Sequence, residues 1–305
     1  MRELVFRGDK QKKNYFEGWY FKFVDSEHDL VIILIPGISN FQEKMAFLQY
    51  IVHYKSEVFN GFLRYDIDRF AIETPFLLKF EHGSLSKEHL SLHLDFMDAE
   101  LDLGEFTPLK TSILSPSIMG FFEYLKMPCF HDVISMNHAV TGSVTIKGES
   151  VAFSGKGYIE GDRGSHFPEF YLWAQCNHFQ NPDTSLFFSV ADISTSCFKF
   201  LGHIAVLYYQ GKEYRFASYL GSKAEVTVSN DKRHAKVIFR NRKHRLGVEI
   251  DLKQGNSLIA PMNHSMDFKI KEQVKSDIKL EFDGYLDESS FCASELVNWK
   301  DVEAE

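Results

Sequence analysis

Paired cysteines, long apolar runs and nucleotide-binding glycine motifs are all missing from this sequence of 305 residues. Its four cysteines are Cys129, Cys176, Cys197 and Cys292. They lie far apart and form no CxxC pair, which argues against a zinc site or a redox dithiol and favours a reducing compartment. The longest apolar run, 30–37, is too short to span a bilayer, and the N-terminus lacks the apolar segment of a signal peptide. We therefore expect a cytoplasmic protein.

Common catalytic and nucleic-acid signatures are also missing. There is no GxSxG elbow, no P-loop and no GxGxxG that follows a strand and opens a helix. The formal net charge is −8, and the one basic cluster, at 232–245, alternates with apolar residues. Such alternation is typical of the solvated face of a β-hairpin, and an acidic protein repels a phosphate backbone. No nucleic-acid partner is expected.

Aromatic residues are abundant. They make up 15% of the chain, with 29 Phe and 13 Tyr, which favours β-structure and flat or greasy ligands. Short strand-like runs recur with turn residues between most of them, and no long segment of 3.6-residue period competes. The predicted strands are 15–24, 30–35, 45–54, 58–65, 77–80, 90–96, 99–103, 133–146, 151–160, 171–179, 185–193, 202–209, 213–219, 223–228, 235–239, 247–251 and 266–270. This spacing predicts antiparallel meanders that close into a barrel or sandwich to hide their edges.

A segment bracketed by prolines, 107–128, interrupts the series of strands. We interpret it as a linker with one short amphipathic helix, because Ser115–Pro116 is a typical helix start. The expected domains are therefore 1–112, and 113–305 with the linker helix at its beginning.

The two halves of the chain resemble each other. NYFEGWYFKFV at 14–24, followed by LVIILIPGIS at 30–39, resembles EFYLWAQCNHF at 169–179, followed by LFFSVADIS at 186–194. Each pair is an aromatic-rich strand, a short loop and an apolar strand that ends in a turn. We interpret this as an internal duplication of one β-meander.

The stretch 155–179 concentrates polar and aromatic side chains. Residues 155–160 alternate as a strand does, GDRG at 161–164 is typical of a turn, and a second strand follows at 169–179. One face of the second strand carries Tyr171, Trp173, Gln175, Asn177 and Phe179. Aromatic rings and amides on one face suit the wall of a pocket for an amphipathic ligand.

Several segments together resemble the tocopherol cyclase family. They are NYFEGWYFK at 14–22, HDVISMNHAVTG at 131–142, GKGYIEGDRG at 155–164 and QCNHF at 175–179. The resemblance implies an all-β fold of two tandem lipocalin-like (calycin-type) antiparallel β-barrels with a short helical linker, as is also expected of the related carotenoid 1,2-hydratases. It further implies that a prenylated or phytylated hydroquinone is cyclised to a chromanol. A proton adds to the alkene and the phenol oxygen closes on the resulting tertiary cation, which needs no cofactor and no metal.

This chemistry needs a carboxylic acid kept protonated by a dry site, aromatic faces beside the cation, and a group that receives the phenol proton. Asp162 and Glu160 are the first candidates for the acid, although Asp162 could equally be a turn residue that caps its own backbone. Glu17 interrupts an apolar run and is expected to pair with Lys22 or with a partner from the second half of the chain, and to contact the substrate. Asp192 is a further candidate acid.

Two Asn-His pairs lie in the segments that carry the resemblance. They are Asn137-His138 and Asn177-His178. A lone strand histidine is commonly an ordinary core or surface residue, but two such pairs favour a shared polar cluster in which Asn and His orient the phenol hydroxyl and His accepts its proton. No helix-borne HxxxH pair is present, so no metal site is expected.

Aromatic side chains complete the predicted site. The candidate wall residues are Trp19, Tyr20, Tyr158, Tyr171 and Trp173, of which some would simply fill a barrel core.

The alternative to a cyclase is a non-catalytic carrier of a hydrophobic small molecule or lipid. The acidic segment distinguishes the two, because Arg163 beside Asp162 would hold the carboxylate ionised and disable it as a donor. Either protein would have a hydrophobic substrate or lipid as its partner and would touch membranes transiently to collect it.

Overall fold

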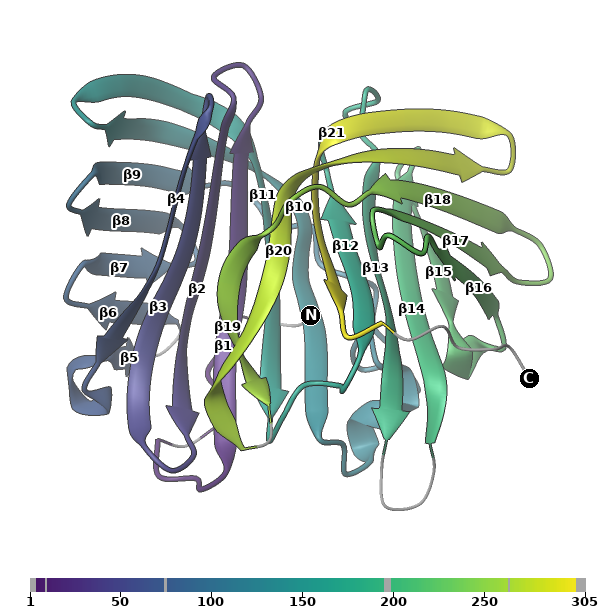
Figure 1. Ribbon diagram of the computed structural model, residues 1–305, viewed down its shortest axis with the longest axis horizontal. Coiled ribbons are helices and arrows are strands. Elements are labelled where there is room, and N and C mark those ends of the chain that lie inside the picture. Colours follow the sequence, from purple (N-terminus) through teal and green to yellow (C-terminus); the bar gives the residue numbers. More distant parts are fainter. Residues whose placement is uncertain (1–3, 9, 74–75, 195–198, 263, 300–305) are drawn as a thin grey trace. The chain divides into compact units, whose positions relative to one another are not determined.

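Antiparallel β-strands make up almost all of the computed structural model of the chain (Figure 1). The structure describes residues 4–8, 10–73, 76–194, 199–262 and 264–299, and Cys197 lies outside these ranges. The helical segments within them are three short 3-10 turns: η1 (Ile67–Arg69), η2 (Gly120–Tyr124) and η3 (Ser218–Leu220). None of these has the length or apolar character that crossing a membrane would require. The prediction of an all-β, lipocalin-like fold is confirmed.

The chain divides into two compact units. Unit 1 comprises Met1–Ile113, Cys129–His166 and Pro261–Phe268, and unit 2 comprises Leu114–Pro128, Phe167–Ala260 and Lys269–Glu305. This division differs from the expected boundary between residues 112 and 113. The reason is strand pairing, since two long strands after the linker complete the sheet that the first strands begin.

The sheet of unit 1 is a curled antiparallel half-barrel of eleven strands. Its strands are β1 (Tyr15–Asp25), β2 (Leu30–Asn40), β3 (Lys44–Tyr54), β4 (Glu57–Tyr65), β5 (Ala71–Glu73), β6 (Leu77–Phe80), β7 (Gly83–Ser86), β8 (His89–Leu94), β9 (Met97–Leu103), β10 (Cys129–Ile146) and β11 (Glu149–Gly164). Their order is β4-β3-β2-β1-β11-β10-β9-β8-β7-β6-β5, so β11 lies between β1 and β10. Figure 1 shows β9 to β5 stacked in a ladder beyond the long strands.

Unit 2 has a sheet of ten strands. They are β12 (Tyr171–Cys176), β13 (Ser185–Ser194), β14 (Lys199–Tyr209), β15 (Lys212–Ala217), β16 (Lys223–Val228), β17 (His234–Arg240), β18 (Arg245–Asp251), β19 (Asn256–Met262), β20 (Ser265–Phe282) and β21 (Tyr285–Val297). The order is β15-β14-β13-β12-β21-β20-β18-β17-β16, and β19 pairs with β20.

The two sheets share one strand order in their central part, as the predicted duplication of one β-meander requires. In each unit four consecutive strands form a meander, β1–β4 or β12–β15. The first strand of the meander pairs with the second strand of a long hairpin, so β1 pairs with β11 of β10–β11 and β12 pairs with β21 of β20–β21. Both hairpins turn through two residues with positive φ, Lys147-Gly148 and Asp283-Gly284, as a tight type I′ turn requires. Both also carry register shifts midway along their pairing. The similar segments noted in the sequence are β1–β2 and β12–β13.

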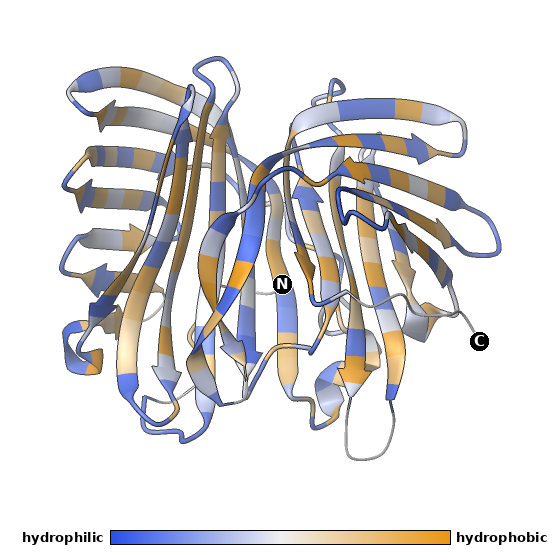
Figure 2. Cartoon of the chain, in the orientation of Figure 1, coloured by the Kyte–Doolittle hydropathy of each residue, from blue (hydrophilic) through white to orange (hydrophobic). Residues whose placement is uncertain are grey.

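Burial distinguishes outer strands from the central ones. β9 alternates between buried and exposed residues, and the colours along it in Figure 2 alternate accordingly. In β1, by contrast, ten of eleven residues are buried, so both of its faces are covered. Glu17, Lys22 and Asp25 are buried polar residues of this strand. A buried charged group costs several kcal/mol unless it is paired, so each of these side chains needs a partner.

The linker differs in detail from its prediction. Its helical turn is η2, which begins at Gly120 rather than at Ser115. The Ser115 hydroxyl bonds the Ser117 carbonyl, and the Ser117 hydroxyl accepts from the Met119 amide. These side-chain bonds compete with a helical backbone, which delays the helix and keeps it short.

Candidate active site

The strand β11 continues through the segment that was predicted to be a turn. Residues 161–164 pair with β1 on one side and with β10 on the other, from Trp19 opposite Gly161 to Phe16 opposite Gly164. The turn prediction is therefore wrong, because neighbours on both sides hold these glycines extended. The consequence is that Tyr158, Glu160 and Asp162 occupy alternate positions of one strand and share a face.

Four polar side chains meet on that face, and we call them the β11 cluster: His131, Tyr158, Glu160 and Asp162. His131 lies opposite Asp162 in the β10–β11 register. Its Nδ1 is 2.9 Å from Asp162 Oδ1, and its Nε2 is 3.6 Å from Glu160 Oε2. The Tyr158 hydroxyl donates to Glu160 Oε2 at 2.6 Å. Glu160 thus lies between an imidazole and a phenol.

Electrostatics keep both neighbours of Glu160 protonated. Burial lowers the pKa of His131, but the charges of Asp162 and Glu160 outweigh it and raise the pKa to about 9. Burial and the Glu160 charge raise the pKa of the Tyr158 hydroxyl well above its ordinary value. At neutral pH the cluster therefore contains an imidazolium and a neutral phenol on either side of one carboxyl group.

Glu17 points to the other face of the sheet, with Trp19 and the core of unit 1. Its carboxylate accepts hydrogen bonds from the backbone amides of Arg7 (2.9 Å) and Gly8 (2.8 Å) and from the Tyr15 hydroxyl (2.6 Å). Burial raises the pKa of Glu17 above its ordinary value, although these donors act in the opposite direction.

Of the two alternatives expected as the partner of Glu17, the structure excludes Lys22 and supports a residue from the second half of the chain. Lys22 is five residues away on the same strand, so it points to the opposite face, where it lies across from Tyr158. The positive charge that acts on Glu17 is that of Arg163, which is opposite it in the β1–β11 register and belongs to the second half of the chain.

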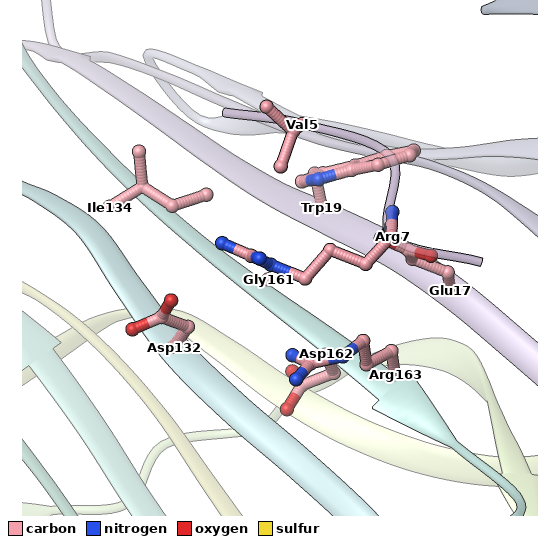
Figure 3. Close-up of a pocket in the computed structure, with 10 residues that line it drawn as sticks. Val5, Arg7, Glu17, Trp19, Asp132, Ile134, Gly161, Asp162 and Arg163 are labelled. Atoms are coloured by element: carbon pink, nitrogen blue, oxygen red, sulfur yellow. Dashed lines mark hydrogen bonds between the residues drawn. The ribbon is translucent and has the colours of Figure 1, made fainter. Parts of the chain in front are cut away.

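A small pocket borders Glu17 on this inner face (Figure 3). Residues of the pocket wall include Arg7, Glu17, Trp19, Asp132, Ile134 and Asp162. Figure 3 shows Arg7 extending across the pocket toward Asp132 and Ile134. The cavity itself holds only about 20 Å³, which is room for a water molecule and far below the ~300–1,000 Å³ of ligand sites. Asp162 also borders this pocket, although its carboxylate is directed to His131 in the β11 cluster on the opposite face.

His138 lies in the core of unit 1. Its Nδ1 is 3.0 Å from Ser135 Oγ, and its ring contacts those of Phe23 and Phe106. Burial lowers the pKa of His138 to about 3, so the imidazole is neutral and a weak base. Asn137 is on the same strand, where its carbonyl accepts from the Ser135 hydroxyl.

The remaining predicted residues belong to unit 2. The Tyr171 hydroxyl donates to Glu295 Oε2 at 2.5 Å, and Trp173 lies opposite Glu295 in the β12–β21 register. The side chains of Asn177 and His178 approach each other at 3.3 Å. The shared cluster of the two Asn-His pairs stays a prediction. Asp192, also in this unit, is buried and lies 3.3 Å from Lys199 Nζ.

His131 is the functional candidate that the sequence analysis did not select. It stands at the start of the HDVISMNHAVTG segment, but its role depends on the pairing of β10 with β11. The pairing of β10 with β11 also brings possible metal ligands together. We expected no metal site from the sequence because we looked for ligand pairs within a single helix. Donor atoms of His131, Glu160 and Asp162 all lie within 4.8 Å of one another.

The site can exchange protons without any change of oxidation state. Its groups comprise a protonated imidazole, a phenol and two carboxyl groups. Hydrogen bonds join Asp162 to His131 and Tyr158 to Glu160, while His131 and Glu160 are an ion pair at 3.6 Å, and the Tyr20 and Tyr158 rings lie 6.4 Å apart beside them. Such a set can deliver a proton to a substrate atom and recover one.

Comparisons with known proteins agree with the fold and define the family. Residues 110–298, more than half of the chain, match the family described as tocopherol cyclase-like. A putative AttH from Nitrosomonas europaea has a similar structure, at 12% identity over 96% of both chains and a TM-score of 0.62. Kievitone hydratase from Nectria haematococca is similar at 7% identity over 98% of this chain and 95% of that one, with a TM-score of 0.54.

At these identities the two structures establish the fold alone, and no curated protein matches the chain in sequence. The match to the family is of a different kind, because it rests on the sequence itself and includes His131 and all of β11. The chain belongs to the tocopherol cyclase-like family.

Proposed function

We propose that this protein cyclises a prenylated or phytylated hydroquinone to a chromanol by protonating its alkene. The observation that carries the proposal is the position of Glu160 between two groups that are protonated at neutral pH, Tyr158 and His131. A carboxylate in this position can take a proton from the His131 imidazolium and pass it to a substrate, while the Tyr158 hydroxyl stabilises its ionised form by a hydrogen bond.

The protons balance in this scheme. His131 passes its proton to Glu160, which donates it to the less substituted alkene carbon and leaves a tertiary cation on the neighbouring carbon. The phenol oxygen attacks that cation, and its proton passes to Asp162, which is hydrogen-bonded to His131. Asp162 then returns that proton to His131, so the site regains its starting state with no oxidant or reductant.

Aromatic rings support the cationic step. Tyr20 lies opposite Glu160 in the β1–β11 register, and its ring meets that of Tyr158 edge to face. The faces of such rings attract a cation, at about 0.5–2 kcal/mol for each contact. Kievitone hydratase, one of the structurally similar proteins, is by its name a hydratase. Hydration is the variant of this mechanism in which water, instead of the phenol, captures the cation.

The test is turnover of a phytylated hydroquinone in D2O. Acid-initiated cyclisation places one deuterium at the former alkene carbon of the chromanol, which mass spectrometry detects. Glu160→Gln should lower the rate by about 10²–10⁴-fold, and Asp162→Asn and His131→Gln should also lower it. Glu149→Gln is the matched control, since Glu149 is an exposed glutamate of the same strand, paired with Lys55.

Ligand binding distinguishes the carrier alternative. Tryptophan fluorescence should show that Glu160→Gln still binds the hydroquinone, since only the proton is lost. A wild-type protein that binds the hydroquinone and forms neither chromanol nor alcohol would be a carrier. Equal turnover by wild type, Glu160→Gln and Asp162→Asn would remove the β11 cluster from the mechanism.

A further inference from the structure

Large apolar side chains are exposed together around η2 and η3 in unit 2. Five of the eight large apolar residues that are exposed in the described part of the chain lie between 113 and 125. Four of these five belong to unit 2, and Leu220 of η3 is exposed beside them. The exposed fractions are 81% for Leu114, 45% for Phe121, 65% for Tyr124, 41% for Leu125 and 56% for Leu220. We call these five residues the η2–η3 patch. Contiguous exposed apolar groups mark an interaction site more often than isolated ones do.

The patch is held in place by hydrogen bonds beneath it. The Tyr219 hydroxyl donates to the Ile118 carbonyl at 2.8 Å, and Arg215 Nη1 donates to Ser115 Oγ at 3.0 Å. The ring of Phe121 also packs edge to face on Tyr219, with centroids 6.3 Å apart. These contacts tie the linker segment to η3. The exposure of the patch is therefore built into the fold of unit 2.

Positive charge flanks the patch, although the protein as a whole carries a net charge of −8. Lys126 directly follows Leu125, Lys223 is three residues after Leu220, and both lysines are exposed. The acidic residue within the segment, Glu123, accepts a hydrogen bond from the Ser117 hydroxyl at 2.9 Å. The local surface thus combines apolar side chains, a tyrosine and lysines.

We propose that the η2–η3 patch docks unit 2 onto a lipid bilayer that contains anionic lipids. Aliphatic side chains would enter the acyl boundary, Tyr124 would sit at the level of the headgroups, and Lys126 and Lys223 would contact the anionic headgroups. Five side chains are few for a protein partner, since a standard interface uses about 20–30 residues on each side. For reversible binding to a membrane surface, a few inserted side chains with adjacent lysines are enough.

This inference goes beyond the proposed reaction, because membrane docking requires neither turnover nor any residue of the β11 cluster. It places the protein at the surface in which a molecule with an isoprenoid tail dissolves. Membrane binding can therefore be tested without substrate, and the failure of one proposal leaves the other standing.

The experiment is co-sedimentation of the purified full chain with phosphatidylcholine vesicles, with and without about one third phosphatidylserine. Wild type should bind the anionic vesicles more tightly. The triple variant Leu114→Ser, Tyr124→Ser and Leu220→Ser should bind them at least about tenfold more weakly. Leu286→Ser is the matched control, since Leu286 is 74% exposed in the β20–β21 hairpin of the same unit. It should bind as wild type does.

Charge reversal tests the electrostatic part separately. Lys126→Glu and Lys223→Glu should each weaken binding to anionic vesicles by at least about fivefold and leave binding to neutral vesicles unchanged. Lys212→Glu, at the far end of β15 from η3, is the control. Absence of wild-type binding at low salt, or equal binding by the triple variant, would overturn the proposal. So would a triple variant that loses self-association in size-exclusion chromatography while its vesicle binding is unchanged, since the patch would then join two copies of the chain.

Discussion

The bare backbone of Gly157 makes room for the imidazole of His138. A Cβ atom at Gly157 would lie 2.2 Å from His138 Nε2 and 2.5 Å from its Cε1, far inside van der Waals contact. The two residues are paired across β10 and β11, and the ring that fills the space is part of the unit 1 core. Glycine at 157 is thus a packing requirement of the histidine.

Gly157→Ala should destabilise the protein by about 1–3 kcal/mol, because the added methyl group overpacks the core. Urea unfolding measures the change. In a His138→Ala background the same substitution should be neutral or stabilising, since the ring is gone and alanine is favoured over glycine in a strand. Gly18→Ala, whose Cβ would meet ordinary contacts at 3.5 Å, is the control. Equal costs in both backgrounds would contradict the packing account.

His138 should also make the protein sensitive to acid. Its pKa is about 3 in the folded state and 6.5 in the reference state, so the unfolded chain binds the extra proton. The stability that this provides is complete above pH 6.5 and is lost as the pH falls toward 3. Relative to His138→Gln, wild type should lose about 3 kcal/mol between neutral pH and about pH 4. His203, whose pKa burial lowers to about 4, titrates in both proteins and cancels. A difference that is independent of pH would contradict this.

His131 should have the opposite pH dependence. Its pKa is raised from 6.5 to about 9 in the folded protein, so its contribution is complete below pH 6.5 and is lost as the pH rises through 9. The unfolding free energy of wild type relative to His131→Gln should therefore fall by about 3 kcal/mol between about pH 6 and about pH 10. Chemical denaturation across this range is the measurement. A constant difference would mean that Asp162 and Glu160 do not hold an imidazolium.

Zinc should inhibit the proposed reaction. Donor atoms of His131, Glu160 and Asp162 lie within 4.8 Å, and binding a metal would displace the proton of His131. Inhibition should be reversed by EDTA, and calorimetry should show zinc binding that weakens about 10–100-fold in His131→Gln. If EDTA instead abolished activity and zinc restored it, the reaction would depend on a metal and the acid mechanism would be wrong.

Much of the fold could be predicted from local pattern. The runs that became β1, β2, β12 and β13 are strongly apolar and aromatic, which is why both the strands and the similarity of the two halves were visible in the sequence. β21 was missed because YLDESSFCASELV is largely polar and lacks regular alternation. It becomes a strand through its neighbours β12 and β20, which the local sequence does not encode.

Only part of the candidate site could be predicted, again because local sequence does not encode long-range pairing. Glu160 and Asp162 were selected at the end of a predicted strand, and period-two spacing places them on one face because that strand continues to Gly164. His131 reaches them only through the register of a partner strand, and Glu17 is held by the amides of Arg7 and Gly8 at the N-terminus. Both are long-range pairings. Glycines at 161 and 164 suggested a turn because their flexibility is visible in sequence, whereas the strands that hold them extended are not.

The strand order that the two sheets share has a consequence for how the chain folds during synthesis. In each unit the first strand of the meander gains its second neighbour only when the last strand is made, β11 for β1 and β21 for β12. Such non-local closure is slow compared with hairpin formation. Until Tyr285–Val297 leaves the ribosome, the fully buried strand β12 presents an open apolar edge. The pairing of β21 with β12 is thus the step that covers this edge and protects unit 2 from aggregation.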